Sequence, residues 1–326
     1  MREFTPGRRA LLGAGLAALP LAKALAAYPD RALRWVVAYA AGGGTDTLAR
    51  LVGANLSNRI GQPIVVENRP GAATNIGAEA VAKSLPDGYT VFSADNGTLV
   101  FNTALFKRLP YDPVRDFRPV GLLARFPLVL AVADKAPADT VQALIAKAKA
   151  APGSIDCATA GIGSPHHLAL ERLSREAGVR FNHVPYRGAA PALNDLIAGT
   201  VPMMVLDYPS GAEYLRAGRV KALAVLSAQP LEEQPSVPTA ESALGLRGFE
   251  AYAWQGLVVP KATPDALVAQ LTRELDATLR DEAVRGRMKA IGLETLTGGP
   301  PEFEALLERE RATWLPLIRD LNITLD

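Results

Sequence analysis

Glycine-rich loops that lead into helices are the part of this 326-residue sequence best suited to chemistry. Five times, a short apolar run is followed by a glycine-containing loop and then by a residue that opens a helical stretch. These loops are residues 42–46, 71–75, 95–98, 161–165 and 188–191. The start of a helix carries unpaired N–H groups and a partial positive charge, so it binds anions without a charged side chain. The repeated pattern therefore predicts anion binding by backbone groups.

The same pattern predicts the elements that must position these loops. Strand, loop and helix alternate in the manner of a parallel sheet with helical cover. Further helices are predicted at residues 139–150, 213–217, 264–291 and 301–321. In open parallel sheets the strand-to-helix loops lie together at the carboxyl edge, where ligands bind. Because no catalytic cluster accompanies the loops, we expect a receptor for a small carboxylate.

Two crossings of the chain predict two lobes. Residues 119–132 form a mostly apolar run that is longer than a typical strand, and we interpret it as a strand that crosses between lobes. Residues 220–227 are interpreted as the return crossing. Lobe I then comprises residues 27–125 plus 228–326, and lobe II comprises residues 126–227. We expect the ligand in the cleft between them.

The first 26 residues have the order of an export signal. Arg8 and Arg9 precede an apolar stretch, and Ala24-Leu25-Ala26 resembles a cleavage site. A twin-arginine signal and ordinary secretion are the two routes, and a buried N-terminal helix is the alternative to both. Export would place the protein in the periplasm.

Composition excludes several partners. Removing the signal takes away four of the 35 basic residues and one of the 33 acidic residues, which leaves a net charge of about −1. A nucleic-acid or anionic-membrane partner is therefore not expected. Cys157 is the single cysteine, so no internal disulfide forms. No later stretch reaches the length of a membrane helix. We expect a soluble monomer.

The loop at residues 42–46 resembles a phosphate loop only superficially. It lacks both the Gly-Lys-Ser/Thr ending and the G-x-G-x-x-G spacing, so nucleotide binding is not predicted. Three successive glycines let the backbone approach a ligand, and Thr45 or Asp46 can cap the following helix. The alternative is a tight turn with a good cap.

Ser164 is the candidate nucleophile. It does not fit G-x-S-x-G, and the Ser-Pro order reads as a helix cap followed by the first helical residue. The rival to a receptor is an exported hydrolase or isomerase that uses Ser164, His167 and Asp207. We predict no enzyme activity.

His166 and His167 are neighbours, and adjacent helical residues point about 100° apart, so they do not share one metal in the usual manner. No metal and no cofactor are predicted. His167 either donates to a ligand or is inert. Asp207 ends an apolar strand and either accepts from a ligand or caps the next loop. Tyr39 points either into the cleft or into the core.

Several motifs, in order, resemble the Bug (TctC-like) family of periplasmic solute-binding proteins. They cover essentially the whole chain after the signal. The motifs are residues 42–46 with Ala49-Arg50, 65–71 with 75–77, 86–90, 109–113 with 116–117, 163–164 with 167–168, 183–186 with Gly188, and 191–193.

The resemblance implies an α/β, two-lobed periplasmic binding protein of the Venus-flytrap, type II-like class, with a mixed, mainly parallel sheet in each lobe. It implies an extracytoplasmic receptor that delivers a carboxylate to the large and small membrane subunits of a tripartite tricarboxylate transporter. The ligand classes are a dicarboxylate, a tricarboxylate, an aromatic acid or an acidic amino acid. A ligand-sensing subunit of a membrane signalling protein is the alternative.

The family's pockets motivate the candidate site, although the chain departs from the family at residues 72–74 and 165–166, which reshapes the pocket. The candidate ligand-binding residues are Tyr39, Gly42, Gly43, Gly44, Thr45, Asp46, Thr74, Asn75, Asn96, Gly97, Thr98, Gly163, Ser164, His167, Tyr186 and Asp207.

Overall fold

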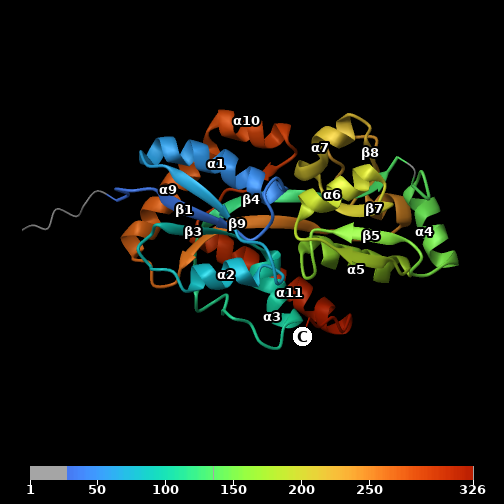
Figure 1. The fold of residues 1–326 in the computed structure, drawn as a ribbon, viewed down its shortest axis with the longest axis horizontal. Helices are drawn as coiled ribbons and strands as arrows, with labels where there is room; N and C mark the ends of the chain where they lie inside the picture. The colour runs from blue at the N-terminus through green and yellow to red at the C-terminus, as the bar shows by residue number, and fades with distance from the viewer. Residues whose placement is uncertain (1–27, 135, 326) are drawn as a thin grey trace, which may run out of the picture.

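The computed structural model describes residues 28–134 and 136–325. The predicted export signal lies outside the described residues. Strands of both lobes join edge to edge in the order β2-β1-β3-β9-β4-β7-β5-β6. Figure 1 shows lobe I at the left and lobe II at the right, with helices above and below the strands. The predicted two-lobed α/β fold is confirmed.

Lobe I holds three parallel strands next to antiparallel ones. β1 pairs in parallel with β2 and β3, whereas β9 is antiparallel to β3 and β4. The strands are β1 (Leu33–Val37), β2 (Ile64–Asn68), β3 (Thr90–Asp95), β9 (Tyr252–Pro260) and the short β10 (Glu294–Thr295), with part of β4 (Phe117–Ala133).

Lobe II repeats this arrangement. β5 pairs in parallel with β6 and β7, and β4 is antiparallel to β7 and β8. Its strands are β5 (Asp156–Thr159), β6 (Asn182–Pro185), β7 (Met203–Asp207) and β8 (Val220–Val225). The sheet in each lobe is therefore mixed, and the parallel strands carry the helix-opening loops.

Strand β4 joins the lobes, as the long apolar run predicted. It pairs with β9 up to Pro127 and with β7 from Leu128 onward. Leu130 and Val132 pack into one core, and Val129 and Ala131 pack into another on the opposite face. Both faces of the strand are buried, which explains a continuous apolar run in place of alternation.

The predicted return crossing at residues 220–227 needs correction. β8 lies along β4 inside lobe II. The chain returns through residues 226–251, which include the short helix α8 (Ala240–Leu244). The lobe boundaries at 125/126 and 227/228 remain a prediction.

All five predicted strand-loop-helix units are present. The helices that they open are α1 (Gly44–Ile60), α2 (Asn75–Ala82), the π-helical turn η1 (Gly97–Phe101) with α3 (Asn102–Leu105), α5 (Pro165–Ala177) and α6 (Ala189–Ala198). The predicted helix at 139–150 is α4 (Val141–Ala150), and α11 (Pro300–Asp320) matches the last predicted helix.

Two helix predictions were wrong in extent. The helix expected at 264–291 is divided into α9 (Asp265–Arg280) and α10 (Glu282–Ala290). Asp281 has extended backbone angles and its carboxylate accepts from the N–H groups of Ala283 and Val284, so a new helix begins there. The helix expected at 213–217 is α7 (Tyr208–Arg216), which starts directly after β7.

Helix α11 anchors lobe I through a close contact with β9. The ring of Phe303 is buried and packs edge-on against Trp254, and a Cβ atom at Gly256 would lie 2.1 Å from this ring. Glycine is therefore required at this point of β9 for α11 to pack on the sheet.

We predict that Gly256→Ala destabilises the protein by about 1–3 kcal/mol, because an added methyl overpacks a rigid contact. The control is Gly286→Ala in α10, where a Cβ atom meets nothing within 4 Å. Urea unfolding of both variants checks this. Equal midpoints for Gly256→Ala and the wild type would contradict the packing account.

Candidate functional site

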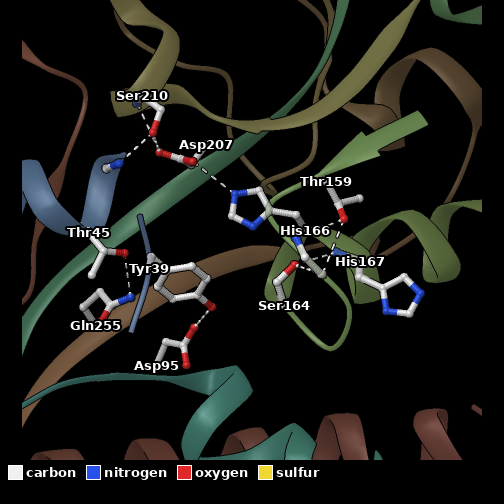
Figure 2. Close-up of polar contacts among 12 residues, drawn as sticks. Tyr39, Thr45, Asp95, Thr159, Ser164, His166, His167, Asp207, Ser210 and Gln255 are labelled. Carbon is white, nitrogen blue, oxygen red and sulfur yellow. Dashed lines mark hydrogen bonds and ion pairs between the residues drawn. The ribbon is translucent and has the colours of Figure 1, made fainter. Parts of the chain in front are cut away.

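The starts of α1, α5 and α6 line one cavity between the lobes, which we call the inner cavity. Figure 2 shows Thr45 at the start of α1 and His166 at the start of α5. The centre of a water-sized molecule can move within ≈ 20 Å³ of this cavity. By the same measure, a cavity that holds one water needs about 10–15 Å³. The inner cavity therefore admits a single small group. Its lining residues are Tyr39, Gly43, Gly44, Thr45, Asp95, Phe126, Ala160, Pro165, His166, Ala189, Asp207, Ala253 and Gln255.

A larger cavity adjoins it, and we call this the outer cavity. Tyr39 and Ala160 line both spaces. Its volume is ≈ 420 Å³, which is in the range of small-molecule sites. It is lined by loop 70–76 of lobe I and by loops 160–164 and 185–187 of lobe II. The two cavities together form the candidate site.

Half of the predicted site residues line these cavities. They are Tyr39, Gly43, Gly44, Thr45, Thr74, Ser164, Tyr186 and Asp207. The predicted residues that line neither cavity are Gly42, Asp46, Asn75, Asn96, Gly97, Thr98, Gly163 and His167.

Among the residues that line neither cavity, Thr98 supports two that do. Thr98 bonds Thr74 and Asp95, and the amide of Asn102 holds Asn75. The amide of Asn96 donates to the carbonyl of Tyr252, away from the cleft.

Backbone groups form the start of α1. Gly43 occupies the cap position without a side-chain cap bond, so the expectation that Thr45 or Asp46 caps this helix was wrong. The hydroxyl of Thr45 accepts from Gln255 at 3.1 Å. The carboxylate of Asp46 accepts from the Gly42 N–H and pairs with Arg50, so lobe I already satisfies it. Helix α6 likewise starts at a glycine, Gly188, without a side-chain cap.

The lobes touch at the first turn of α1. The Gly44 N–H donates to Ser210 Oγ of lobe II at 2.7 Å. A Cβ atom at Gly44 would lie 2.3 Å from Asp207 Oδ1 and 3.1 Å from Phe126. The cleft is thus closed in this structure, and the closed contact requires glycine at position 44.

Asp207 uses both carboxylate oxygens within lobe II. Oδ1 accepts from the N–H and hydroxyl of Ser210, and Oδ2 lies 3.1 Å from His166 Nε2 (Figure 2). Burial by itself raises the pKa of Asp207, but the hydrogen bonds from His166 and Ser210 outweigh it and hold the pKa below its usual value. The cap alternative for Asp207 is confirmed, and the carboxylate also orients His166.

The start of α5 separates the two adjacent histidines. Ser164 accepts from the His167 N–H and donates to the Gly161 carbonyl, which confirms the cap interpretation. His166 faces the inner cavity, whereas His167 turns away and stacks on His183 with ring centroids 4.0 Å apart (Figure 2). The candidate site therefore contains His166, which the sequence analysis did not select, in place of His167.

Tyr39 points into the cleft and separates the two cavities. Its hydroxyl donates to Asp95 Oδ2 at 2.5 Å, and Asp95 Oδ1 accepts from the N–H and hydroxyl of Thr98. Burial and the neighbouring Asp95 carboxylate raise the pKa of Tyr39 well above its usual value. Tyr39 is therefore a neutral donor. Sequence analysis missed Asp95, Phe126 and Gln255, although the loop at 95–98 did signal the neighbourhood.

Strained backbone forms one wall of the outer cavity. Ala72, Ala73 and Thr74 all have left-handed φ angles, of 46°, 51° and 74°. Such a run costs energy in residues other than glycine, so its surroundings must hold it. Asn102 does so by donating to the carbonyl of Ala73.

Among residues 28–134 and 136–325, no group of three or more His, Cys, Asp or Glu side chains is placed to hold a metal. In the same part of the chain, every helix is too short or too polar to cross a membrane.

We predict that Gly44→Ala weakens binding of the protein's tightest carboxylate ligand at least tenfold, because the added methyl keeps the lobes apart. The matched control is Gly53→Ala in the same helix, where a Cβ atom would meet Ile64 at an ordinary 3.4 Å. Calorimetric titration measures both. Unchanged affinity in Gly44→Ala would show that closure at this contact is unnecessary.

A second prediction concerns the stacked histidines. Burial, together with the adjacent His167, lowers the pKa of His183 from 6.5 to about 3. Between these values the unfolded chain binds a proton that the folded protein does not bind. Stability should therefore fall as the pH drops from about 6.5 towards 3, by at most about 1.4 kcal/mol per pH unit from this group.

Urea unfolding at pH 7.0 and pH 4.5 tests this in the wild type and in His183→Asn. The variant should lose less stability between the two pH values, although it is less stable at pH 7.0 because the stack is gone. Parallel losses in both proteins would refute the assignment to His183.

Comparison with known proteins places this arrangement in a family. Residues 48–323 match the model of the tripartite tricarboxylate transporter family receptor. The chain is 34% identical to protein BugT of Bordetella pertussis over 319 residues, which is 97% of this chain and 98% of BugT.

Two solved structures are also similar. An R. palustris protein with adipate superposes with a TM-score of 0.88 at 34% identity, covering 91% of this chain and all of that chain. MatC from Rhodopseudomonas palustris with bound malate has a TM-score of 0.85 at 34% identity, and the match covers 89% of this chain and 100% of MatC. The chain therefore belongs to the tripartite tricarboxylate transporter receptor family.

Proposed function

We propose that this protein is an extracytoplasmic receptor that closes its lobes on a small carboxylate in the candidate site. The observation that carries the proposal is the meeting of three helix starts, those of α1, α5 and α6, at one cavity between the lobes. Two of these starts have glycine caps that leave backbone N–H groups for a ligand. Carboxylates are among the anions that such groups bind without a charged side chain.

Size and charge support a small organic acid. The outer cavity, at ≈ 420 Å³, accommodates a short dicarboxylate or an aromatic acid. Arg187 lines this cavity, is exposed, and makes no ion pair with any other described residue. It is therefore a free cation at the entrance to the cleft. The adipate and malate carried by the two similar structures belong to the same chemical class.

The energetics require closure. One helix start contributes about 0.3–1 kcal/mol, up to ~2 kcal/mol when partly buried. Micromolar affinity needs about 8 kcal/mol after ordering costs. The remaining free energy comes from other polar contacts to the ligand and from the lobe-to-lobe contacts that closure creates, such as the bond between Gly44 and Ser210.

Geometry disfavours the hydrolase alternative. Ser164 donates to the Gly161 carbonyl, and the His167 ring accepts from the Gly163 N–H, so the serine hydroxyl has no imidazole base. Asp207 pairs with His166, the other histidine. Family membership favours a transport role over a sensor role. We propose that the protein works in the periplasm and delivers its ligand to the two membrane subunits of a transporter.

Calorimetric titration against monocarboxylates, dicarboxylates, tricarboxylates, aromatic acids and acidic amino acids tests the proposal. We expect at least one acid to bind with micromolar affinity or better and to raise the melting temperature. No turnover should accompany binding. The absence of any binding tighter than millimolar would refute the receptor assignment.

We further predict that Arg187→Gln weakens dicarboxylate binding about two- to fivefold at low salt, because an exposed ion pair is worth about 0.2–1 kcal/mol. The loss should shrink in 0.5 M salt, since screening weakens exposed charges. Arg219→Gln removes an exposed charge that lines neither cavity and serves as the control. Equal affinities for the two variants would contradict a role for Arg187.

A further inference from the structure

Two buried polar atoms in the inner cavity have no partner among the described residues. They are Nδ1 of His166 and Oε1 of Gln255. The two residues are 6% and 2% exposed. Buried polar atoms are normally hydrogen-bonded, so an unpaired atom in a cavity wall calls for an explanation. A bound ligand that supplies the missing partner is one.

The neighbours of these atoms define what they can bind. The carboxylate of Asp207 only accepts, so the facing Nε2 of His166 carries a hydrogen, and in this tautomer Nδ1 offers a lone pair. The amide nitrogen of Gln255 donates to Thr45, which leaves Oε1 as a free acceptor. Both unpaired atoms therefore accept hydrogen bonds.

The nearby hydroxyls of Tyr39 and Ser210 supply no donor for them, and the backbone N–H groups at the starts of α1 and α6 remain for the carboxylate. The hydroxyl of Tyr39 is committed to Asp95, and the hydroxyl of Ser210 is committed to Asp207. Two carboxylates, those of Asp95 and Asp207, also line the space. A group that enters must therefore bring its own hydrogens, and it must be as small as a water molecule.

We infer that the ligand is a carboxylate bearing a small donor group that enters the inner cavity, either an ammonium group that donates to both His166 and Gln255 or a hydroxyl group that donates to one of them. This inference rests on the proposed function and narrows its ligand class. The carboxylate lies where the two cavities adjoin, beside the starts of α1 and α6, and the carbon chain occupies the outer cavity. Because His166 belongs to lobe II and Gln255 to lobe I, an ammonium group bonds both lobes and stabilises the closed state. His166 and Gln255 thus determine specificity.

Matched acids of one chain length test the inference by calorimetry. The series are succinate, malate and aspartate; glutarate, 2-hydroxyglutarate and glutamate; and adipate with 2-aminoadipate. In the series that binds tightest, the hydroxy or amino acid should bind at least tenfold tighter than the unsubstituted acid. Comparing the hydroxy acid with the amino acid in each series also distinguishes the two donor groups, since an ammonium group can donate to both acceptors and a hydroxyl group to one.

Two variants connect the preference to these residues. His166→Gln can keep a donor for Asp207 while losing the acceptor Nδ1, and Gln255→Met removes the amide at similar volume. Each should reduce the preference to within threefold, because it weakens binding of the substituted acid more than binding of the unsubstituted acid. A purely structural role would weaken all acids alike. Gln142→Met, on exposed α4, is the control and should keep the full preference.

The outcomes separate the two proposals. If unsubstituted acids bind as tightly as substituted ones, the inner cavity holds a water in place of a ligand group and the inference fails while the receptor function stands. A preference that survives both substitutions also overturns it. If no acid in any series binds, the proposed function fails as well.

Discussion

The site depends on one contact, the approach of the first turn of α1 to Asp207. The surroundings of Gly44 have no space for a side chain, and the Gly44 N–H donates to Ser210 across the cleft. Asp207 also caps α7 and holds His166 at the start of α5. One carboxylate thereby connects the starts of three helices from two lobes. A ligand in this gap contacts backbone from both lobes at once, which is the condition for binding to drive closure.

Two of the three helices that open on the inner cavity lack a side-chain cap, whereas the third, α5, is capped by Ser164. α1 and α6 begin at glycines without side-chain caps, whereas α4, α8 and α10 have a capping Thr, Thr and Asp. A side-chain cap satisfies the N–H groups that an anion would otherwise bind. Because α1 and α6 have no side-chain cap, the N–H groups of their first turns stay available to a ligand. The acidic side chains in the cleft, Asp95 and Asp207, are in contrast satisfied by their own lobes, so they shape the cavity without leaving free charge.

Sequence predicted the fold better than the site. Apolar runs and glycine loops located all five strand-loop-helix units, because period and turn chemistry are local. The break at Asp281 was missed because Leu279, Val284 and Met288 continue an apolar pattern across it. Among side chains, the choice between His166 and His167 depends on how α5 is rotated, which packing decides. Gln255 and Asp95 lie opposite each other on neighbouring strands, β9 and β3. Only the order of the strands in the sheet brings them to the cleft, and a local sequence pattern does not give that order.

A crystal structure of the protein with its tightest-binding carboxylate would test the central claim most directly. The account predicts ligand carboxylate oxygens within hydrogen-bonding distance of backbone N–H groups at the starts of α1 and α6, with the lobes closed at Gly44. A ligand held on one lobe alone, or bound through side chains outside the two cavities, would contradict it.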